Sequence, residues 1–366
     1  MRDAHHAPVT DAPDHRADPD AWARALGVSR EAIDLHLACD IVDLHVDSFI
    51  WTRVFGRDIR RRHGRGPFGA RFFGHADLPR LREANVTGAI WSVTTNPFRG
   101  AEGRARVFAR NLERLRGILA SASDQVSLVR DLAGYRASRA AGKHAAFLGI
   151  QGGNALDRDD AALSLLDGGD ILKVTLVHLS SSSLGETNAP GGRADAGLTP
   201  AGKRYVEALD AKRVFVDLAH IGRQAFFDAV DVHDRTRPLL VSHTGVSGVT
   251  PMWRNIDDAQ LRAIADTGGV VGIIFHGGFL GGAYWSGGNA RAIVDHIAHV
   301  CDVAGEDHVA LGSDWDGAIV TPRDMPTCLE LPRLVQFMLD RGFGEARVRK
   351  VMSGNFLRAL GDLRGS

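Results

Sequence analysis

Short runs of β-branched and other apolar residues alternate along the chain with longer amphipathic stretches. This alternation is typical of parallel β/α units and differs from the pattern of a sandwich or a helical bundle. Helices are indicated at residues 105–120, 257–266 and 289–303, and Thr199 before Pro200 is a typical helix start. The pattern predicts an α/β fold, a (β/α)8 TIM-type barrel. The apolar runs place its eight strands at residues 41–45, 86–93, 145–151, 172–178, 214–220, 238–243, 270–275 and 308–313.

The chain reads as one barrel domain, residues 39–366, because no internal repeat or proline-rich linker divides it. Residues 1–38 form a head that we expect to be flexible or helical. Its first part is rich in His, Asp, Pro and Arg and lacks the apolar stretch of a secretory signal. Two long loops, 53–74 and 180–197, account for the length beyond the roughly 250 residues of a typical barrel.

Composition narrows the classes of function. The chain has 44 Lys+Arg and 44 Asp+Glu, and this zero net charge argues against a nucleic-acid partner or an anionic membrane surface. The three cysteines, Cys39, Cys301 and Cys328, are too few and too scattered for a disulfide framework or a thiolate zinc site. No apolar run reaches the roughly 18 residues that a spanning helix needs. We therefore expect no membrane span and a cytoplasmic, reducing location.

Polar residues stand where the predicted strands end. In a barrel of this type the carboxyl ends of the strands converge on one mouth, where the chemistry takes place. A single histidine at a strand end is typically structural, but a packed barrel has no structural need for polar ends on six of its eight strands. The sequence therefore predicts an active site at this rim. Its candidate residues are His45 with Asp47, Gln151, His178, Asp217 with His220, His243, and Asp314.

The residue types at the rim favour metal chemistry. His45 and Asp47 are two residues apart, so both side chains lie on one face of an extended segment and can bind the same ion. Imidazole and carboxylate ligands without thiolate favour zinc, with manganese or iron as alternatives, in an open coordination sphere. Such an ion lowers the pKa of water toward ~7, which predicts hydrolysis. Asp314 is then the candidate general acid/base, and His178 either stabilises the oxyanion or anchors a loop. His276 is a weaker candidate at the same rim.

Arginines gather in the first long loop. In a chain of zero net charge this cluster has two interpretations, a solvated loop or a gate that attracts anionic substrates. The sequence leaves both open. The arginines stand at positions 53, 57, 60, 61, 62, 65 and 71.

The order of these motifs resembles the membrane dipeptidase (renal dipeptidase) family of zinc metallopeptidases from about residue 41 to residue 360. Any one motif is weakly specific, but the ordered series is specific. The resemblance implies a distorted (β/α) barrel of the metal-dependent hydrolase type, with a binuclear zinc centre that cleaves dipeptides and tolerates D-residues at the carboxyl-terminal position. It rests on Asp43-Leu44-His45-Val46-Asp47, Asp77-Leu78-Pro79-Arg80-Leu81-Arg82, Ile90-Trp91-Ser92, Gly149-Ile150-Gln151-Gly152-Gly153, Leu176-Val177-His178, Gly197-Leu198-Thr199-Pro200-Ala201-Gly202, Val216-Asp217-Leu218-Ala219-His220, Ser242-His243, Arg254-Asn255-Ile256, Gly312-Ser313-Asp314-Trp315-Asp316-Gly317 and Gly354-Asn355-Phe356-Leu357-Arg358.

The resemblance also implies roles for single residues. His45 and Asp47 would hold one zinc, and His220 and His243 would hold the other. Members of the family commonly form dimers, so a homodimer with a dipeptide-like substrate is the implied assembly.

Three further residues are implied to handle the substrate. His178 would contact it near the scissile carbonyl, and Asp314 would shuttle the proton. Arg254 would bind the terminal carboxylate, for which a guanidinium group is a bidentate match. The alternative for Arg254 is that it braces the loop before the next helix.

Gln151 departs from the family pattern, because the family has a glutamate here that bridges both zincs. An amide offers one neutral oxygen ligand, so Asp47 remains the only anionic ligand among the implied set, and the repulsion between two ions is poorly neutralised. Asn154, where the family usually has histidine, is a second departure. We expect at least one ion to be weakened or lost.

Three outcomes are open. Two ions are still bound, helped by hydroxide or Asp314; or a single ion is held through His45, Asp47 and one or both of His220 and His243; or catalysis is lost. The leading prediction is metal-dependent hydrolysis of dipeptides. The alternatives are a mononuclear hydrolase of another small amide, lactone or N-acyl amino acid, and a non-catalytic binding protein that kept the fold.

Overall fold

The protein is described by a computed structural model that covers residues 14–66, 68–96, 99–157, 160–193, 195–282 and 287–365. Within these residues every paired strand of the central sheet runs parallel to its neighbours. The strands are β1 (Val42–Val46), β2 (Gly88–Thr94), β3 (Val126–Leu128), β4 (His144–Gln151), β5 (Ile171–Thr175), β6 (Phe215–Asp217), β7 (Leu240–Thr244), β8 (Val270–Ile273) and β9 (Val309–Leu311).

Eight of these strands form a closed barrel, which confirms the predicted fold. The ladder runs in the order β2-β1-β9-β8-β7-β6-β5-β4, and β4 pairs back with β2 from Gly88↔Ala145 to Thr94↔Gln151. The remaining strand, β3, was not predicted. It pairs with the start of β4, through Val126↔His144. Its three residues include only one fully buried side chain, so no apolar run marks it in the sequence.

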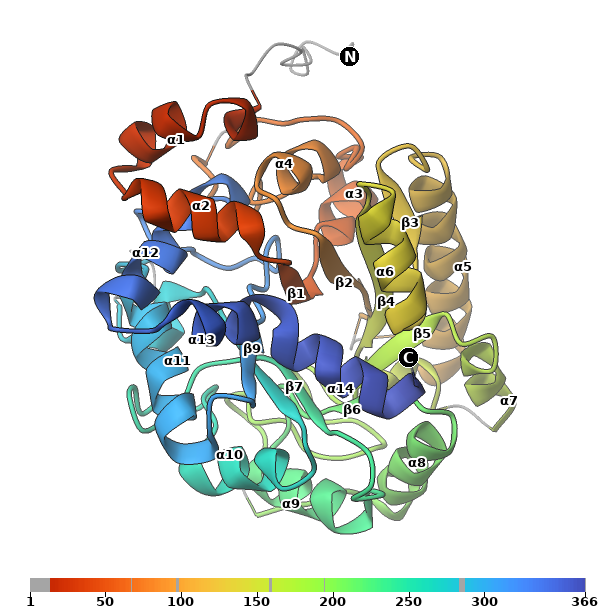
Figure 1. Ribbon diagram of the computed structural model, residues 1–366. Coiled ribbons are helices and arrows are strands. Elements are labelled where there is room, and N and C mark those ends of the chain that lie inside the picture. The colour runs from red at the N-terminus through yellow and green to blue at the C-terminus, as the bar shows by residue number, and fades with distance from the viewer. Residues whose placement is uncertain are drawn as a thin grey trace.

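Helices surround the barrel in Figure 1, with the first two outside the strands at the top of the view. Local sequence sets their ends: Thr199 caps α8 by accepting from Gly202 N, and Asp257 and Gln260 form a capping box at α10. The helices are α1 (Pro19–Leu26), α2 (Arg30–Ala38), α3 (Phe49–Phe55), α4 (Leu78–Glu83), α5 (Ala101–Ala120), α6 (Leu132–Ala140), α7 (Asp160–Leu163), α8 (Pro200–Ala211), α9 (Arg223–Val232), α10 (Asp258–Ala265), α11 (Arg291–Ala304), α12 (Pro332–Asp340), α13 (Glu345–Arg349) and α14 (Asn355–Arg364).

Three predicted boundaries need correction. The first long loop was expected to begin at Arg53, but residues 53–55 complete α3. The strands expected at 172–178 and 214–220 are shorter, because β5 ends at Thr175 and β6 ends at Asp217. The chain turns early at both places, so the histidines expected at these strand ends stand on loops above the barrel. The predicted loop at 180–197 contains no helix or named strand among its described residues.

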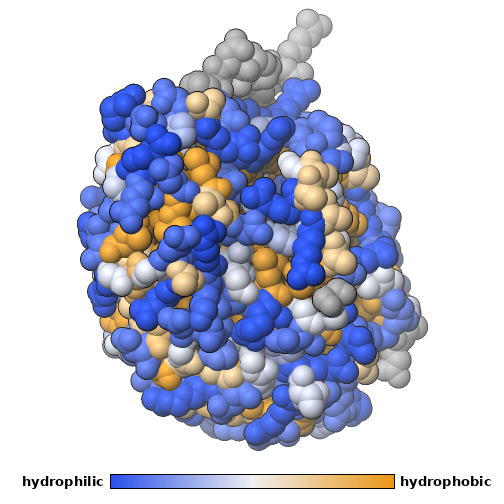
Figure 2. Space-filling model, viewed as in Figure 1, coloured by the Kyte–Doolittle hydropathy of each residue, from blue (hydrophilic) through white to orange (hydrophobic). Residues whose placement is uncertain are grey.

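The predicted head falls partly outside the described residues, since 1–13 are not described. Its remaining part contains α1 and α2. Ser29 N, just before α2, donates to Gln336 Oε1 of α12, and α2 lies against α12. None of the described helices is both long and apolar enough to cross a membrane. The face shown in Figure 2 is largely hydrophilic, with smaller apolar patches between the polar residues.

Candidate metal centre

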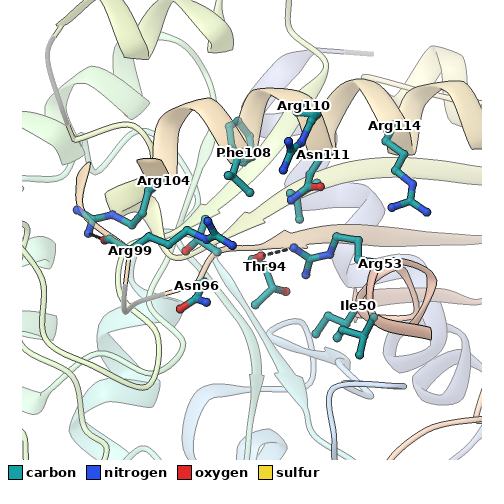
Figure 3. Close-up of a pocket in the computed structure, with 14 residues that line it drawn as sticks. Ile50, Arg53, Thr94, Asn96, Arg99, Arg104, Phe108, Arg110, Asn111 and Arg114 are labelled. Carbon is teal, nitrogen blue, oxygen red and sulfur yellow. Dashed lines mark hydrogen bonds between the residues drawn. The ribbon is translucent and has the colours of Figure 1, made fainter. Parts of the chain in front are cut away.

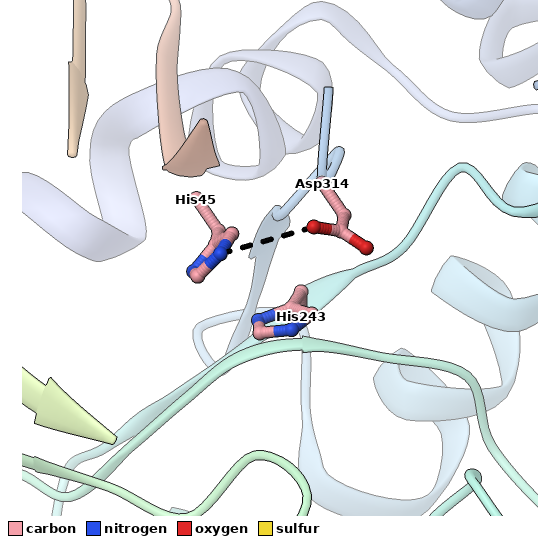
Figure 4. Close-up of side chains that lie close together, drawn as sticks. All are labelled: His45, His243 and Asp314. Atoms are coloured by element: carbon pink, nitrogen blue, oxygen red, sulfur yellow. Dashed lines mark ion pairs between the residues drawn. The ribbon is translucent and has the colours of Figure 1, made fainter. Parts of the chain in front are cut away.

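Three potential metal ligands from distant parts of the chain meet at the barrel mouth. His45 lies on β1, His243 on β7, and Asp314 follows β9 (Figure 4). One ligand atom from each lies within 4.8 Å of the other two, and all three side chains are buried. His45 Nε2 is 3.8 Å from Asp314 Oδ1 and 3.5 Å from Asp47 Oδ2. The structure therefore brings the predicted residues of β1, β7 and β9 together.

The other predicted ligands, His220 and Gln151, border this group at His243. His220 Nε2 lies 2.9 Å from His243 Nε2, and the amide nitrogen of Gln151 lies 3.3 Å from His220 Nε2 and 3.4 Å from His243 Nε2. The ring of His178 packs edge-on against that of His220, with centroids 4.7 Å apart. All predicted ligand residues therefore converge at the mouth. Gln151, at the end of β4, and His220, after β6, have polar atoms within contact distance of each other and of His243.

The histidines of the site are held neutral. Burial lowers the pKa of His45 below its usual value, lowers the pKa values of His220 and His243 well below theirs, and brings that of His178 to about 4. A neutral imidazole keeps the lone pair that a metal ion needs. Although burial opposes it, the neighbouring His45 lowers the pKa of Asp47, so this carboxylate stays charged. The protonation states therefore suit a cation.

Asp314 differs from Asp47 in its electrostatics. Burial, followed by the charge of Asp47, raises the pKa of Asp314 well above its usual range. A carboxyl group with a raised pKa can hold and release a proton near neutral pH. Asp314 and His220 also have left-handed backbone conformations, with φ of 60° and 66°, which cost non-glycine residues about 1–3 kcal/mol. Both strained residues stand at the mouth, so the fold maintains these two side-chain positions at an energetic cost.

A buried lysine supports the site from below. Lys173 Nζ donates to Asp217 Oδ2 at 2.7 Å and to Ser242 Oγ at 2.9 Å, and it lies 2.9 Å from His45 Nδ1. Gly149 provides room for this side chain, since a Cβ there would lie 3.0 Å from Lys173 Cγ. Nε2 of His45 faces the site, 3.5 Å from Asp47 Oδ2 and 3.8 Å from Asp314 Oδ1, and it has no hydrogen-bond partner.

Sequence reasoning missed Lys173. A signal was present, because a lysine in the middle of an apolar strand must find a buried partner. That partner is Asp217, whose carboxylate also accepts from Thr175 Oγ1 at 2.5 Å. Burial opposes ionisation of Asp217, but the charge of Lys173 outweighs it and lowers the pKa of Asp217 to about 2.

Arg254 is a buried cation beside the ligands. Its Nη2 donates to His243 O at 2.6 Å, while Nε and Nη1 have no hydrogen-bond partner. Burial lowers the pKa of this guanidinium to about 10, which leaves it charged at neutral pH. A buried arginine with two unused donor groups is suited to a planar anion such as a carboxylate.

Gln151 and Thr94 share a hydrogen-bond arrangement that decides what the amide can do. Thr94 Oγ1 lies 2.8 Å from Asp47 Oδ1 and 3.0 Å from Gln151 Oε1, yet a hydroxyl has only one proton to donate. Turning the amide by half a rotation satisfies both contacts, because Asp47 then takes that proton and the Gln151 amide donates to Thr94. In this orientation Gln151 Oε1 faces the nitrogens of His220 and His243, where it can serve as a neutral ligand.

Other sequence candidates lie outside the cluster. His276 Nδ1 lies 3.2 Å from Val320 O, and its ring packs edge-on against Phe279, so it holds a loop. The side-chain oxygen of Asn154 accepts from Thr95 Oγ1 at 3.4 Å. Most of the arginine loop pairs with carboxylates; Arg62, for example, lies 2.8 Å from Glu83.

The donor set fits zinc or a similar borderline ion. Imidazole nitrogens and carboxylate oxygens are its ligands in catalytic sites, and none of the three free cysteines belongs to the cluster. Nε2 of His45 is buried among the ligand atoms without a hydrogen-bond partner, and a bound cation would give it one. The residues present therefore fit the predicted metal.

The fold and this site define a metal-dependent hydrolase built on a (β/α)8 barrel. The chain belongs to the membrane dipeptidase family (peptidase family M19), whose family model matches residues 29–364. This membership confirms the predicted resemblance and the predicted class, a metal-dependent dipeptide hydrolase, and it implies a metal cofactor.

The chain is also similar to individual known proteins and solved structures. The chain is 39% identical over 166 residues to an uncharacterized protein in the pqqA 5′ region of Klebsiella pneumoniae, a match that spans 45% of this chain and 60% of that protein. Its fold matches the crystal structure of dipeptidase AC with a TM-score of 0.80 and 26% identity, over 90% of this chain and 99% of that one. It also matches a Rhodobacter sphaeroides metallopeptidase liganded with a phosphinate mimic of L-Ala-D-Ala, with a TM-score of 0.79 and 25% identity over 89% and 99% of the two chains.

Proposed function

We propose that this chain hydrolyses dipeptides with one firmly held zinc ion, bound by His45, His243 and Asp314 with Asp47 beside them. The observation that carries the proposal is the buried group of ligand atoms within 4.8 Å of one another, together with the unpartnered Nε2 of His45. A bound divalent ion supplies Lewis acidity and makes water nucleophilic at neutral pH. The other steps belong to the protein's own side chains.

Charge balance favours one firm ion over two. Asp47 and Asp314 can supply two negative charges at the mouth, and Arg254 already adds a positive charge. The two carboxylates compensate one divalent ion and leave the positive charge of Arg254 for the substrate carboxylate, whereas a second ion would add two further charges without a bridging carboxylate. The neutral group formed by Gln151 Oε1 and His220 is therefore a weaker second site. This adopts the single-ion outcome for the metal, with Asp314 in place of Asp47 as the carboxylate ligand, and it keeps the dipeptide as substrate.

The side chains around the ion divide the remaining work. Arg254 binds the terminal carboxylate of the substrate through its free Nε and Nη1 groups. Asp314 faces the ligand group through Oδ1, which leaves Oδ2 to take the proton of the attacking water and deliver it to the leaving amine. His178, whose Nδ1 has no hydrogen-bond partner, donates to the developing oxyanion. The Rhodobacter sphaeroides structure with its dipeptide mimic supports this class of substrate.

The test is turnover of a defined substrate panel. Purified protein is incubated with zinc or manganese and with L,L and L,D dipeptides, and the released amino acids are quantified. Asp314→Asn is the matched inactive control. An N-acyl amino acid and a lactone in the same panel test the alternative substrates. Dipeptide hydrolysis that depends on added metal and on Asp314 is expected. Absence of turnover with every dipeptide and metal would overturn the proposal, and turnover of the N-acyl amino acid or the lactone alone would replace the substrate class.

A further inference from the structure

A basic pocket lies beside the metal centre, between α3, the end of β2 and α5 (Figure 3). Its volume is about 600 Å³, and no Asp or Glu is among the residues that line it. Its basic side chains come from three separate segments. They are Arg53, Arg99, Arg104, Arg110 and Arg114.

The positive charge of this pocket is largely uncompensated. Arg104 pairs with Asp157 at 3.1 Å, but the other four arginines make no ion pair with any described residue. Arg53 Nη1 donates to Thr94 O at 3.1 Å and Arg114 Nη2 to Thr52 O at 3.3 Å, so both donate to backbone carbonyls; Arg53 also lies over the Phe49 ring, 5.4 Å from its centroid. Arg53 Nε is buried without a partner. In a chain with zero net charge, unpaired guanidinium groups around one cavity favour an anionic occupant.

The pocket shares a wall with the ligands. Thr94 lines it, and Thr94 Oγ1 also donates to Asp47 Oδ1 at 2.8 Å. The pocket lies at the end of β2. In the closed ring β2 stands opposite β7, because three strands separate the two in either direction. Arg254, which follows β7, therefore stands across the mouth from this pocket. A substrate whose carboxyl end binds Arg254 extends its amino-terminal residue toward β2.

We propose that the pocket binds an acidic side chain on the amino-terminal residue of the substrate, so that the preferred substrates are dipeptides of the Asp-X or Glu-X type. The inference rests on the proposed function and specifies its substrate class. Hydrolysis adds hydroxide to the carbonyl carbon of that residue and a proton to the leaving amine, which releases the acidic amino acid and X. Arg53, Arg110 and Arg114 are positioned as the specificity residues.

The test compares two isomeric dipeptides, which carry the acidic residue at either end, with a neutral dipeptide. The values of kcat/KM for L-Asp-L-Ala, L-Ala-L-Asp and L-Ala-L-Ala are measured with the zinc-loaded protein. We expect L-Asp-L-Ala to exceed both others by about tenfold or more, since charge-assisted hydrogen bonds are stronger than neutral ones. The preference falls as salt is added, because the pocket is open to solvent. Equal values for L-Asp-L-Ala and L-Ala-L-Asp would overturn the inference while leaving the proposed function intact.

A matched pair of variants assigns the preference to the pocket. Arg110 and Arg114 are exposed on α5, so the double change Arg110→Gln with Arg114→Gln is compatible with the fold. It is expected to lower the ratio of kcat/KM for L-Asp-L-Ala to that for L-Ala-L-Ala by about tenfold. The control is Arg106→Gln on the same helix, because Arg106 is exposed and does not line the pocket. If the double variant and the control lower this ratio equally, or if neither lowers it, the inference is contradicted.

Binding separates this inference from the catalytic proposal. Calorimetry with the Asp314→Asn protein gives dissociation constants for L-Asp-L-Ala and L-Ala-L-Ala without turnover. Tighter binding of L-Asp-L-Ala by about tenfold, lost in the double arginine variant, supports the pocket even where no dipeptide is cleaved. Equal binding of the two dipeptides rejects the pocket even where both are cleaved by the unmodified protein.

Discussion

The two halves of the barrel mouth have similar residue types but different contacts. On the side of β1, β7 and β9, His45 Nε2 is unpartnered and three ligand atoms lie within 4.8 Å of one another. On the side of β4 and β6, the Gln151 amide lies 3.3 Å from His220 Nε2 and carries no charge. The two halves therefore differ in charge. The half with Asp47 and Asp314 can balance the charge of an ion, whereas the half with Gln151 and His220 is neutral because an amide stands where the family has a carboxylate. Metal affinity should follow this difference.

The largest expected effect comes from removing one ligand in each half. His243→Ala should lower kcat/KM by more than about a thousandfold, because the several kcal/mol that the ion contributes are lost with it. His220→Ala should lower it by only about ten- to a hundredfold, the range for residues that support a metal site. Steady-state kinetics in zinc buffer measures both variants. Equal losses would show that the two halves contribute alike.

Removing the support beneath His45 should affect both stability and affinity. Lys173→Met leaves Asp217 buried without its partner, which costs about 3–5 kcal/mol in the free energy of unfolding. Zinc affinity should also fall by about ten- to a hundredfold, because His45 loses its orienting contact. Urea unfolding and competition with a chelating dye measure the two effects.

A double variant separates the effect on stability from the effect on zinc affinity. Lys173→Met combined with Asp217→Leu should recover much of the stability while zinc affinity stays low. Recovery of both would mean that the lysine acts on the fold alone. Lys212→Met, at a partly exposed surface pair with Asp167, is the control and should change neither quantity appreciably.

Changing Arg254 tests how the half that holds the ion recognises the substrate carboxylate. Arg254→Met should raise KM for free dipeptides by about ten- to a hundredfold, because the substrate carboxylate loses a charge-assisted partner. The discriminating readout is the ratio between a dipeptide and its carboxyl-terminal amide. The unmodified protein should prefer the free acid, and the variant should treat both alike. Persisting discrimination would place carboxylate recognition elsewhere.

The smallest expected effect per residue is the dependence of stability on pH. Burial lowers the pKa values of five histidines from 6.5 to about 4, so below pH 6.5 the unfolded chain takes up protons that the folded chain does not. Stability is therefore present above pH 6.5 and is lost as the pH falls toward 4, by up to about 1.4 kcal/mol per pH unit for each histidine. The five are His36, His144, His178, His276 and His296.

Zinc sharpens this measurement, because binding requires neutral His45 and His243. Unfolding midpoints between pH 5 and pH 7 should fall more steeply with zinc than with a chelator, since acid also releases the ion. A stability that is flat over this range would contradict the burial of these histidines in neutral form.

The sequence indicated the barrel and the rim because both depend on short-range patterns. Apolar strand runs mark each β/α unit, and the polar residue that ends a strand can be read directly, as with His45 and Gln151. The positions of single side chains depend on contacts between distant strands. The contact of Lys173 with His45, and the sharing of Thr94 between Asp47 and Gln151, join strands that sequence spacing cannot place. The basic pocket was missed for the same reason, because Arg53 is the only one of its arginines that belongs to the arginine cluster at positions 53–71.

The most direct test of the account is the zinc content of protein purified without chelators. Elemental analysis should find about one ion per chain in the unmodified protein and about two in Gln151→Glu, because the restored carboxylate neutralises the second ion. Gln224→Glu, an exposed change on α9, is the control and should leave the content at about one. Two ions in the unmodified protein, or a single ion in Gln151→Glu, would contradict the claim that the amide sets the difference between the two halves.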